Sequence, residues 1–422
     1  MLPISSSSTI RPCHFALPPL DASLPGSAGE PDLCPPSPAE IAERARGQLL
    51  GEAGPEVVAA EWGSARWLPA RSITTSYRLL LADGAERLVA FQRWRQGRTA
   101  GVPSPRTSAD DSRQELIWSF PVDSMLHGLP RLLSPGRTAR LLERAGMAPP
   151  GAISRRSLKL LPLRYQPERQ ALVRLELLLD GGAQPPAPWV VAARALPPGE
   201  ACRVAQAQRA LAAGLAPRLL AEDPGCGLLV EEWVAAPTCP PGDFSLARAA
   251  GSLLACLHSS RPLAPMPLAL APLLAESMAV LMRIPALSPL LNGLAAPTHR
   301  LGASPIHGSF HPGQLALAPT GLRLLGFGRC GLGEPARDLA SWVAAHLLKD
   351  PAVSFEQAAA PLLEGYREEG DCSISEAQLQ VWTELELVHR AAAALSSLET
   401  SAIEQAKRAL LCARCLAGGA RD

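Results

Sequence analysis

The alternation of apolar and polar residues in the first half of the chain predicts β-hairpins. Alternating positions at 73–81, a turn at 82–84 and an apolar run at 88–91 have the pattern of two paired strands. Residues 160–197 show the pattern again, with a long strand, a glycine-containing loop and an apolar return strand. The repetition indicates either a weak internal repeat or two edge hairpins of one sheet.

The segments around these hairpins predict a few further elements. A short helix begins at Pro38 and runs to about residue 52, and the polar segment 95–114, dotted with glycine and proline, predicts a loop. The segment 200–223 predicts a helix that ends at Gly214. "CGLLVEEWVAAP" at 226–237 then predicts a buried strand that leads into a connector.

In the second half, helical periodicity dominates and only the short segment 304–333 has a mixed pattern. The predicted helices lie near 243–260, 268–292, 337–348, 355–368, 374–396 and 398–417. A β-rich half with one helix, a connector and a helical half is the layout of a two-lobed, protein-kinase-like α+β fold. Fold alone does not give function, so the site residues must decide it.

This layout predicts four regions along the chain. They are a disordered Ser/Pro-rich arm at 1–38, an N-terminal extension with a β-hairpin at 39–150, a β-rich lobe with its connector at 151–237, and a helical lobe at 238–422.

Composition and charge narrow the class of protein. The chain has 422 residues, of which 47% are hydrophobic and 19% charged, as in globular proteins. The formal net charge of +1 gives no electrostatic reason to expect a nucleic acid or a membrane as partner. No apolar run is long enough to span a bilayer, and the first residues lack the pattern of a signal peptide.

Cysteine usage points to a reducing compartment. The ten cysteines show no disulfide-framework spacing, so we expect a cytoplasmic protein. The single CxxC, at 412–415, lies in a helical segment, and two further zinc ligands are not near in sequence. Ordinary helix cysteines are therefore the favoured interpretation, and a redox or metal role is the alternative.

Two segments carry the candidate chemistry, "HGSFHPGQLAL" at 307–317 and "LLGFGRCGLGEPARDLA" at 324–340. They resemble the aminoglycoside phosphotransferase family, whose pattern is approximately HGDxHPxNxL, an ID(F/W) strand and a GxGDPAxDLA turn. The resemblance covers roughly residues 60–400 and is most specific in these two segments. It implies a kinase-like fold and, in active members, transfer of phosphate from ATP with magnesium.

The chain departs from the family pattern where phosphate and metal are handled. Ser309 stands at the position of the catalytic Asp, Gln314 at that of the magnesium-binding Asn, and Gly326 at that of the metal-binding Asp. Glu334, in the turn before the last motif, is a candidate substitute ligand. A serine is a poor base near neutral pH, and magnesium prefers carboxylate and other hard oxygen ligands.

The nucleotide positions implied by the resemblance also depart from the family. Arg194 is the best match to the lysine that contacts ATP phosphates, and none of the three lysines lies there. Glu231 and Trp233, in the strand before the connector, are the other candidate cofactor-binding residues. Glu168, in the turn "PER", introduces a carboxylate near the expected phosphates.

The histidines and the remaining aspartate have structural interpretations. His307 and His311 are four residues apart and could be two ligands of a metal. They lie in a loop, however, and a carboxylate that could serve as the third ligand is missing, so packing is favoured over metal binding. His258 is expected to contact the same loop from a helix end. Asp338 is expected to hold the catalytic loop by hydrogen bonds, and a Ser309–histidine nucleophile is disfavoured because the G-x-S-x-G pattern is absent.

These substitutions lead to competing hypotheses. The first is a pseudokinase that serves as a binding or regulatory module for an unknown protein or small-molecule partner, with no cofactor assigned to it. The alternative is an active phosphotransferase that uses ATP and magnesium on a small hydroxylated molecule. Nucleotide binding with different chemistry is a third. The acid-poor stretch 244–337 argues against cationic aminoglycosides as ligands.

Overall fold

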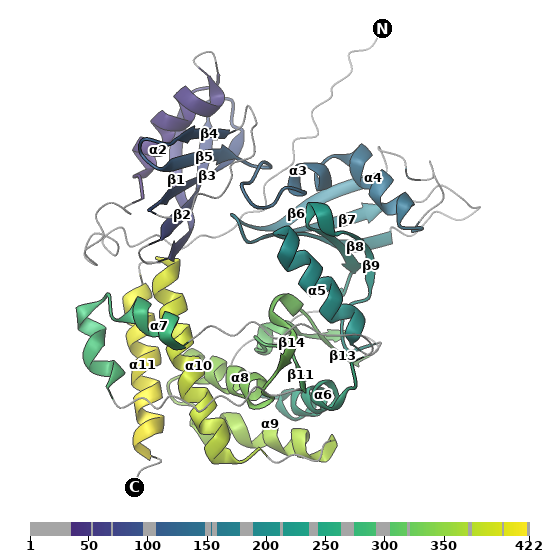
Figure 1. Cartoon of the computed structure of the whole chain (residues 1–422), viewed down its shortest axis with the longest axis vertical. Coiled ribbons are helices and arrows are strands. Elements are labelled where there is room, and N and C mark those ends of the chain that lie inside the picture. Colours follow the sequence, from purple (N-terminus) through teal and green to yellow (C-terminus); the bar gives the residue numbers. More distant parts are fainter. Residues whose placement is uncertain are drawn as a thin grey trace.

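The computed structural model covers most of the chain, and its described residues fall into the following ranges. They are 35–51, 54–68, 71–95, 107–147, 153, 158–177, 189–211, 214–235, 244–262, 274–292, 304–318, 321–369, 374–398 and 401–419. Figure 1 shows two separate sheets above a mainly helical part.

The first sheet is five-stranded and antiparallel. Its strands, in the order β1-β2-β3-β5-β4, are β1 (Val57–Leu68), β2 (Ser72–Leu81), β3 (Glu86–Trp94), β5 (Glu115–Ser119) and β4 (Thr107–Asp110). The predicted hairpin is β2–β3. The predicted loop at 95–114 is wrong for residues 107–110, which form β4; residues 96–106 lie outside the described residues.

One helix covers the first sheet. Helix α2 (Pro38–Ala45) begins at a capping box in which Ser37 and Glu40 satisfy each other's backbone N–H groups, and a π-helical turn, η2 (Arg46–Leu50), continues it. Ile41 packs on Tyr77, whose hydroxyl donates to the Pro36 carbonyl at 2.7 Å. The end of the predicted arm is therefore packed on the sheet, whereas residues 1–34 lie outside the described residues.

The second sheet is also five-stranded and antiparallel. Its order is β6 (Leu158–Gln166), β7 (Gln170–Leu177), β8 (Trp189–Ala195), β10 (Leu228–Glu232) and β9 (Leu219–Asp223). The two predicted hairpins therefore belong to two sheets, and the alternative of two edge hairpins in one sheet is wrong.

Helices pack on both faces of the second sheet. Figure 1 shows the short α3 (Leu129–Leu132) and α4 (Pro135–Arg144) on one face and α5 (Pro198–Ala210) on the other. Leu129 and Leu142 belong to the core of this sheet, although the predicted boundary at residue 150 assigned them to the N-terminal extension. Helix α5 ends at Ala210, earlier than the predicted Gly214, because Leu211 adopts an extended backbone.

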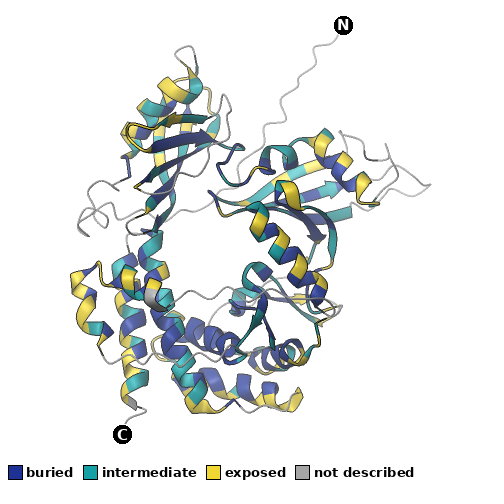
Figure 2. Cartoon of the chain, in the orientation of Figure 1, coloured by how far each residue is buried: buried dark blue, intermediate teal, exposed yellow. Residues whose placement is uncertain are grey.

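The helices of this part are α6 (Ala247–Ser259), α7 (Leu274–Leu281) with the 3-10 helix η4 (Pro285–Leu291), α8 (Ala336–Lys349), α9 (Phe355–Glu369), α10 (Glu376–Ser397) and α11 (Ala402–Gly419). Five of the six predicted helices lie within a few residues of their expected bounds. The prediction of one continuous helix at 268–292 is wrong, because α7 and η4 divide this segment, and residues 268–273 lie outside the described residues. Figure 2 shows α8 buried along nearly its whole length, so this helix forms the centre of the part.

Two small two-stranded sheets occupy the predicted mixed segment. Strand β11 (Ser304–Ile306) pairs with β14 (Gly331–Gly333), and β12 (Leu315–Ala318) pairs with β13 (Gly321–Leu324). Two 3-10 turns, η5 (Pro312–Gln314) and η6 (Phe327–Arg329), lie beside them. This pairing brings the two motif segments together although they are separated in sequence.

The two sheets and the helical part contact one another through distinct groups. Val204 of α5 belongs to the core of the helical part, and Trp67 and Ile73 of the first sheet pack with Leu395 and Leu398 near the end of α10. The β-rich N-terminal half and helical C-terminal half confirm the predicted two-lobed α+β fold with an N-terminal extension. Among the described residues, no helix is both long and apolar enough to cross a membrane.

Candidate functional site

Asp338 fixes the loop that carries the first motif. Its buried carboxylate, in the first turn of α8, accepts hydrogen bonds from the backbone N–H groups of His307 (2.6 Å) and Gly308 (2.8 Å). Gly308 has a φ of +79°, and a Cβ there would lie 2.3 Å from the Arg329 carbonyl oxygen. The loop conformation therefore requires glycine at this position.

Two further side chains support this anchor. His258 Nε2 lies 3.1 Å from Asp338 Oδ2, and its Nδ1 lies 2.8 Å from the Tyr366 hydroxyl. Burial by itself would raise the pKa of Asp338, but the hydrogen bond and charge of His258, with those of His307, hold it below the ordinary value. The Arg337 guanidinium donates to the Gly308 carbonyl at 2.7 Å. The geometry matches the structural roles predicted for His258 and Asp338.

His307 is an internal part of the loop. Its Nε2 lies 2.7 Å from the Leu325 carbonyl oxygen, and its ring packs against Phe310 and Phe327. Burial lowers the pKa of His307 and lowers that of His311 to about 4, so both rings are neutral at neutral pH. Within the described residues, no group of three or more His, Cys, Asp or Glu side chains could hold a metal ion.

The side chain of Gln314 fills the space next to the Cα atom of Gly326. Gly326 has a φ of +77°, and a Cβ built on it would lie 2.1 Å from Gln314 Oε1 and 2.5 Å from its Cδ. The carboxamide of Gln314 therefore lies where a side chain at position 326 would begin. The backbone keeps the two positions adjacent, because Leu325 donates to the Gln314 carbonyl at 2.8 Å. A neutral amide thus occupies the region where the family pattern has a metal-binding carboxylate.

Ser309 has no base hydrogen-bonded to it among the described residues. The residue is partly exposed, and no hydrogen bond of its hydroxyl occurs within the described part of the chain. The arrangement of a nucleophile with an oriented base, which an acyl- or phosphoryl-transfer serine would need, is therefore missing from the described residues.

The two candidate substitute carboxylates are engaged elsewhere. Glu334 accepts a hydrogen bond from Gln378 of α10 at 3.3 Å. Glu168 is buried, and its carboxylate accepts hydrogen bonds from Thr74 (2.7 Å) and Gln92 (3.0 Å) of the first sheet and from Ser124 (2.9 Å). Desolvation is the main cause of its raised pKa. Glu168 therefore joins the two sheets.

The candidate cofactor residues are brought together only in part. Arg194 Nε lies 3.0 Å from Glu231 Oε2 on a neighbouring strand, and Gln208 of α5 donates to Glu231 Oε1 at 2.8 Å. Glu231 is almost fully buried, and Arg194 and Gln208 lie within reach of its two carboxylate oxygens. Trp233, two residues after Glu231, has the Arg174 guanidinium 5.1 Å from its ring centroid.

A group of four arginines, which the motif comparison did not identify, lies where several segments meet. They are Arg66 of β1, Arg164 of β6, Arg169 of the β6–β7 turn and Arg329 of η6. Two contacts bring Arg66 and Arg169 near each other. Arg66 is the cross-strand partner of Thr74, and the Thr74 hydroxyl donates to Glu168, which precedes Arg169 in the chain. We call these four residues the arginine cluster.

The arginine cluster is electrostatically unbalanced. Arg169 reaches solvent, yet desolvation lowers its pKa, and the positive charges of Arg66, Arg329 and Arg164 lower it further; Glu200 opposes them. No member of the cluster makes an ion pair within 4 Å among the described residues. Arg203 of α5 donates to the carbonyls of Gly328 and Cys330, so it fixes the backbone on both sides of Arg329.

Comparisons with known proteins give only distant likenesses. No protein-family model matches the chain, and no curated protein matches it. A choline kinase from Cryptosporidium parvum Iowa II is 11% identical, with 67% of this chain and 96% of that chain covered and a TM-score of 0.47. Choline kinase LicA from Streptococcus pneumoniae is 14% identical, with coverages of 65% and 99% and a TM-score of 0.42.

A mutant aminoglycoside 2'-phosphotransferase-IIIa in its GDP complex is also similar. It is 14% identical, with 68% of this chain and 100% of that chain covered and a TM-score of 0.41. Likenesses this distant decide nothing about the chemistry of this chain, so the function has to follow from its own side chains.

Proposed function

We propose that the chain is a catalytically silent protein of kinase-like fold, a binding or regulatory module that holds an anionic ligand with arginines instead of a metal ion. The observation that carries the proposal is the carboxamide of Gln314 in the space beside Gly326. Kinase-type phosphoryl transfer depends on magnesium ions that carboxylate and amide side chains hold against the phosphates. Here an amide and a glycine stand at those two positions.

The missing base supports the same proposal. A positioned general base contributes typically about 10²–10⁴ in rate. Ser309 has no basic partner among the described residues, and its own hydroxyl is a poor base near neutral pH. The loop is nevertheless held by Asp338, His258 and Arg337 through groups that need no metal. The fold of the loop is thus independent of catalysis.

The arginine cluster supports the anionic ligand. Guanidinium groups remain charged at all physiological pH values and bind carboxylate and phosphate oxygens in pairs of hydrogen bonds. Mutual repulsion within the cluster costs free energy, and a bound anion would relieve it. The charge that magnesium supplies in active kinases would come from side chains in this protein.

The alternative, an active ATP- and magnesium-dependent phosphotransferase for a small hydroxylated molecule, would need another carboxylate at the metal. Glu334 and Glu168 are hydrogen-bonded to Gln378 and to the first sheet, respectively. In the proposed role the chain works in the cytoplasm. The cysteines that the structure describes are unpaired thiols, which fits a reducing compartment.

Thermal unfolding with anionic probes tests the proposal. Purified full-length protein is titrated with ATP, ADP and tripolyphosphate, each with magnesium and with EDTA. Because a ligand of the native state stabilises it by mass action, about 2.7 kcal/mol at 100 times Kd, we expect the melting temperature to rise equally with and without metal. The rise should be strongly reduced in Arg169→Ala and Arg329→Ala.

Matched controls separate the proposal from its alternative. Arg87→Ala, an exposed arginine of β3 outside the cluster, should bind the probes like the natural protein. A shift that requires magnesium, together with ATP turnover that disappears in Ser309→Ala, would establish the active enzyme and refute the silent module. No shift with any anion would refute the ligand part of the proposal.

A further inference from the structure

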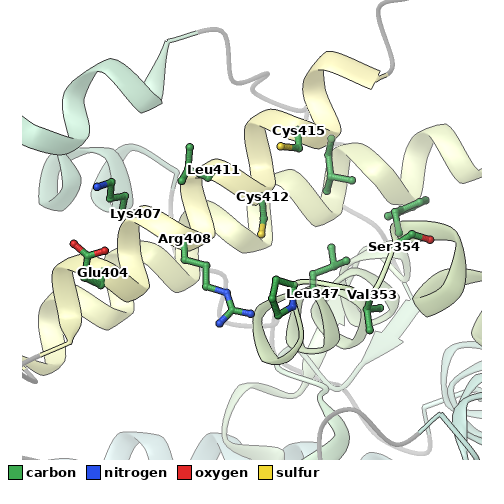
Figure 3. A pocket seen from close by; sticks show the side chains of 12 residues that line it. Leu347, Val353, Ser354, Glu404, Lys407, Arg408, Leu411, Cys412 and Cys415 are labelled. Carbon is green, nitrogen blue, oxygen red and sulfur yellow. The ribbon is translucent and has the colours of Figure 1, made fainter.

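An apolar recess lies on the surface of the helical part, away from the arginine cluster. It has a volume of about 440 Å³ and lies between α11 and the end of α8 with the segment that follows it. Figure 3 shows Leu347 and Val353 on one side and Leu411 and Cys412 of α11 on the other. Leu347 is about 14 Å along α8 from Asp338 at the usual rise per residue, so the recess is separate from the loop described above.

The recess contains one polar atom that lacks a partner. Arg408 Nη2 is buried, and it makes no hydrogen bond among the described residues. Glu404, one helical turn earlier, makes no ion pair with Arg408 either. Figure 3 shows the Arg408 side chain extending from α11 toward the helix that carries Leu347. A buried guanidinium N–H without an acceptor is costly, because burial removes its water without replacing it.

The two cysteines of the CxxC segment lie at this recess. Burial raises the pKa of Cys412, although the charge of Arg408 opposes the shift, so the thiol is neutral at neutral pH and behaves as an apolar wall. Cys415 is exposed at the edge of the recess. The described residues supply no further ligands for a metal here.

We propose that this recess binds an aliphatic carboxylate. The hydrocarbon chain would lie against Leu347, Val353 and Leu411, and the carboxylate would accept a hydrogen bond from Arg408. Small-molecule sites are typically apolar cavities of about 300–1,000 Å³ with a few placed polar groups, and this recess has both properties. The inference is independent of the function proposed for the arginine cluster.

Calorimetric titration of the full chain with decanoate, octanoate and decanol tests this inference. We expect saturable binding of decanoate, with affinity falling about fourfold for each methylene removed, the factor that corresponds to about 0.8 kcal/mol per buried CH₂. Arg408→Met keeps much of the apolar stem but removes the charge. It should weaken decanoate about 10- to 100-fold, as expected for a hydrogen bond to a charged group, and leave decanol unchanged.

Two controls keep the result interpretable. Arg414→Met changes an exposed arginine of the same helix that donates to the Pro289 carbonyl, and it should leave decanoate affinity unchanged. Leu411→Trp narrows the recess at a side chain that is 45% exposed and should weaken both decanoate and decanol. This second variant tests the site even where Arg408→Met fails to fold.

Alkylation of Cys415 gives an independent readout. Peptide mass spectrometry after iodoacetamide treatment should show slower modification of Cys415 with decanoate, and unchanged modification of Cys202, an exposed thiol on α5. Absence of saturable decanoate binding would overturn the inference. Equal weakening of decanoate and decanol in Arg408→Met would also overturn it, because the guanidinium would then not recognise the carboxylate.

Discussion

Substitution of Gly326 tests whether the Gln314 amide occupies the space of the missing carboxylate. An alanine Cβ at position 326 would lie 2.1 Å from Gln314 Oε1, far inside van der Waals contact, so the amide must move. In a Gln314→Ala background the same Cβ would meet no amide. The pair of substitutions therefore forms a double-mutant cycle in which the steric overlap is the coupling.

Two contributions set the expected magnitude. The φ of +77° at Gly326 makes a Cβ unfavourable by about 1–2 kcal/mol in the left-handed region. Overpacking adds about 1–3 kcal/mol where the surroundings have to shift. Gly326→Ala should therefore cost about 2–5 kcal/mol alone, but only about 1–2 kcal/mol with Gln314→Ala, a coupling of about 1–3 kcal/mol.

Urea unfolding of the four proteins of the cycle measures this coupling. Gly321→Ala is the matched control, because Gly321 has a φ of +114° and a Cβ added to it would have no neighbouring atom within 4 Å. Its cost should not change when Gln314 is replaced. Equal costs for Gly326→Ala in both backgrounds would show that the Gln314 amide does not fill this space, and the main support for a silent site would fail.

Three other substitutions follow from the same contacts. Asp338→Asn replaces a carboxylate that accepts two backbone N–H groups, so we expect a loss of about 2–3 kcal/mol in urea unfolding, against little change for the exposed Asp350→Asn. Glu168→Gln turns an amide N–H toward the donors Thr74 and Gln92 of the first sheet, so the free energy of unfolding should fall by about 1–3 kcal/mol and backbone hydrogen exchange in β2 should become faster. Unchanged exchange in β2 would argue against a contact between the two sheets at Glu168. The pKa of His311 falls from 6.5 to about 4 on folding, so between these pH values the unfolded chain binds a proton that the folded chain does not. The free energy of unfolding therefore decreases as the pH falls through this interval, by at most about 3 kcal/mol. His311→Gln should make the unfolding midpoint less dependent on pH between about pH 7 and pH 4.5, and an unchanged dependence would assign it to other groups.

Helix prediction succeeded where large apolar residues recur at helical spacing, as Leu339, Trp342, Val343 and Leu347 do in α8. Helix α8 was expected at 337–348 and spans Ala336–Lys349. Strand β1 was missed because it has little inward–outward alternation, and its pairing with β2 shifts register between Val57 and Ala59 and between Trp62 and Ala65. A bulged strand breaks the period of two on which strand prediction depends.

The site could be predicted only where its residues lie in the two motif segments. The contact of Asp338 with the loop at 307–314 was expected from these segments, and the structure has it. The direction of Glu168 could not be read from the turn "PER", because Glu168 has a φ of +61° and its carboxylate is positioned by side chains of the first sheet. The arginine cluster joins three segments far apart in sequence, around Arg66, around Arg164 and Arg169, and at Arg329, so only the tertiary structure reveals it.

Charge balance distinguishes the two ways in which a kinase-like site can hold an anion. In an active kinase the metal is a separate component, so a chelator abolishes binding of the metal–nucleotide complex. In this chain the positive charge of Arg66, Arg164, Arg169 and Arg329 belongs to the protein itself. Binding through these partly exposed side chains should therefore weaken with ionic strength, because salt screens their charge, and should resist chelation. A site that loses its ligand to EDTA but not to salt would be a metal site, which is the opposite of what these side chains predict.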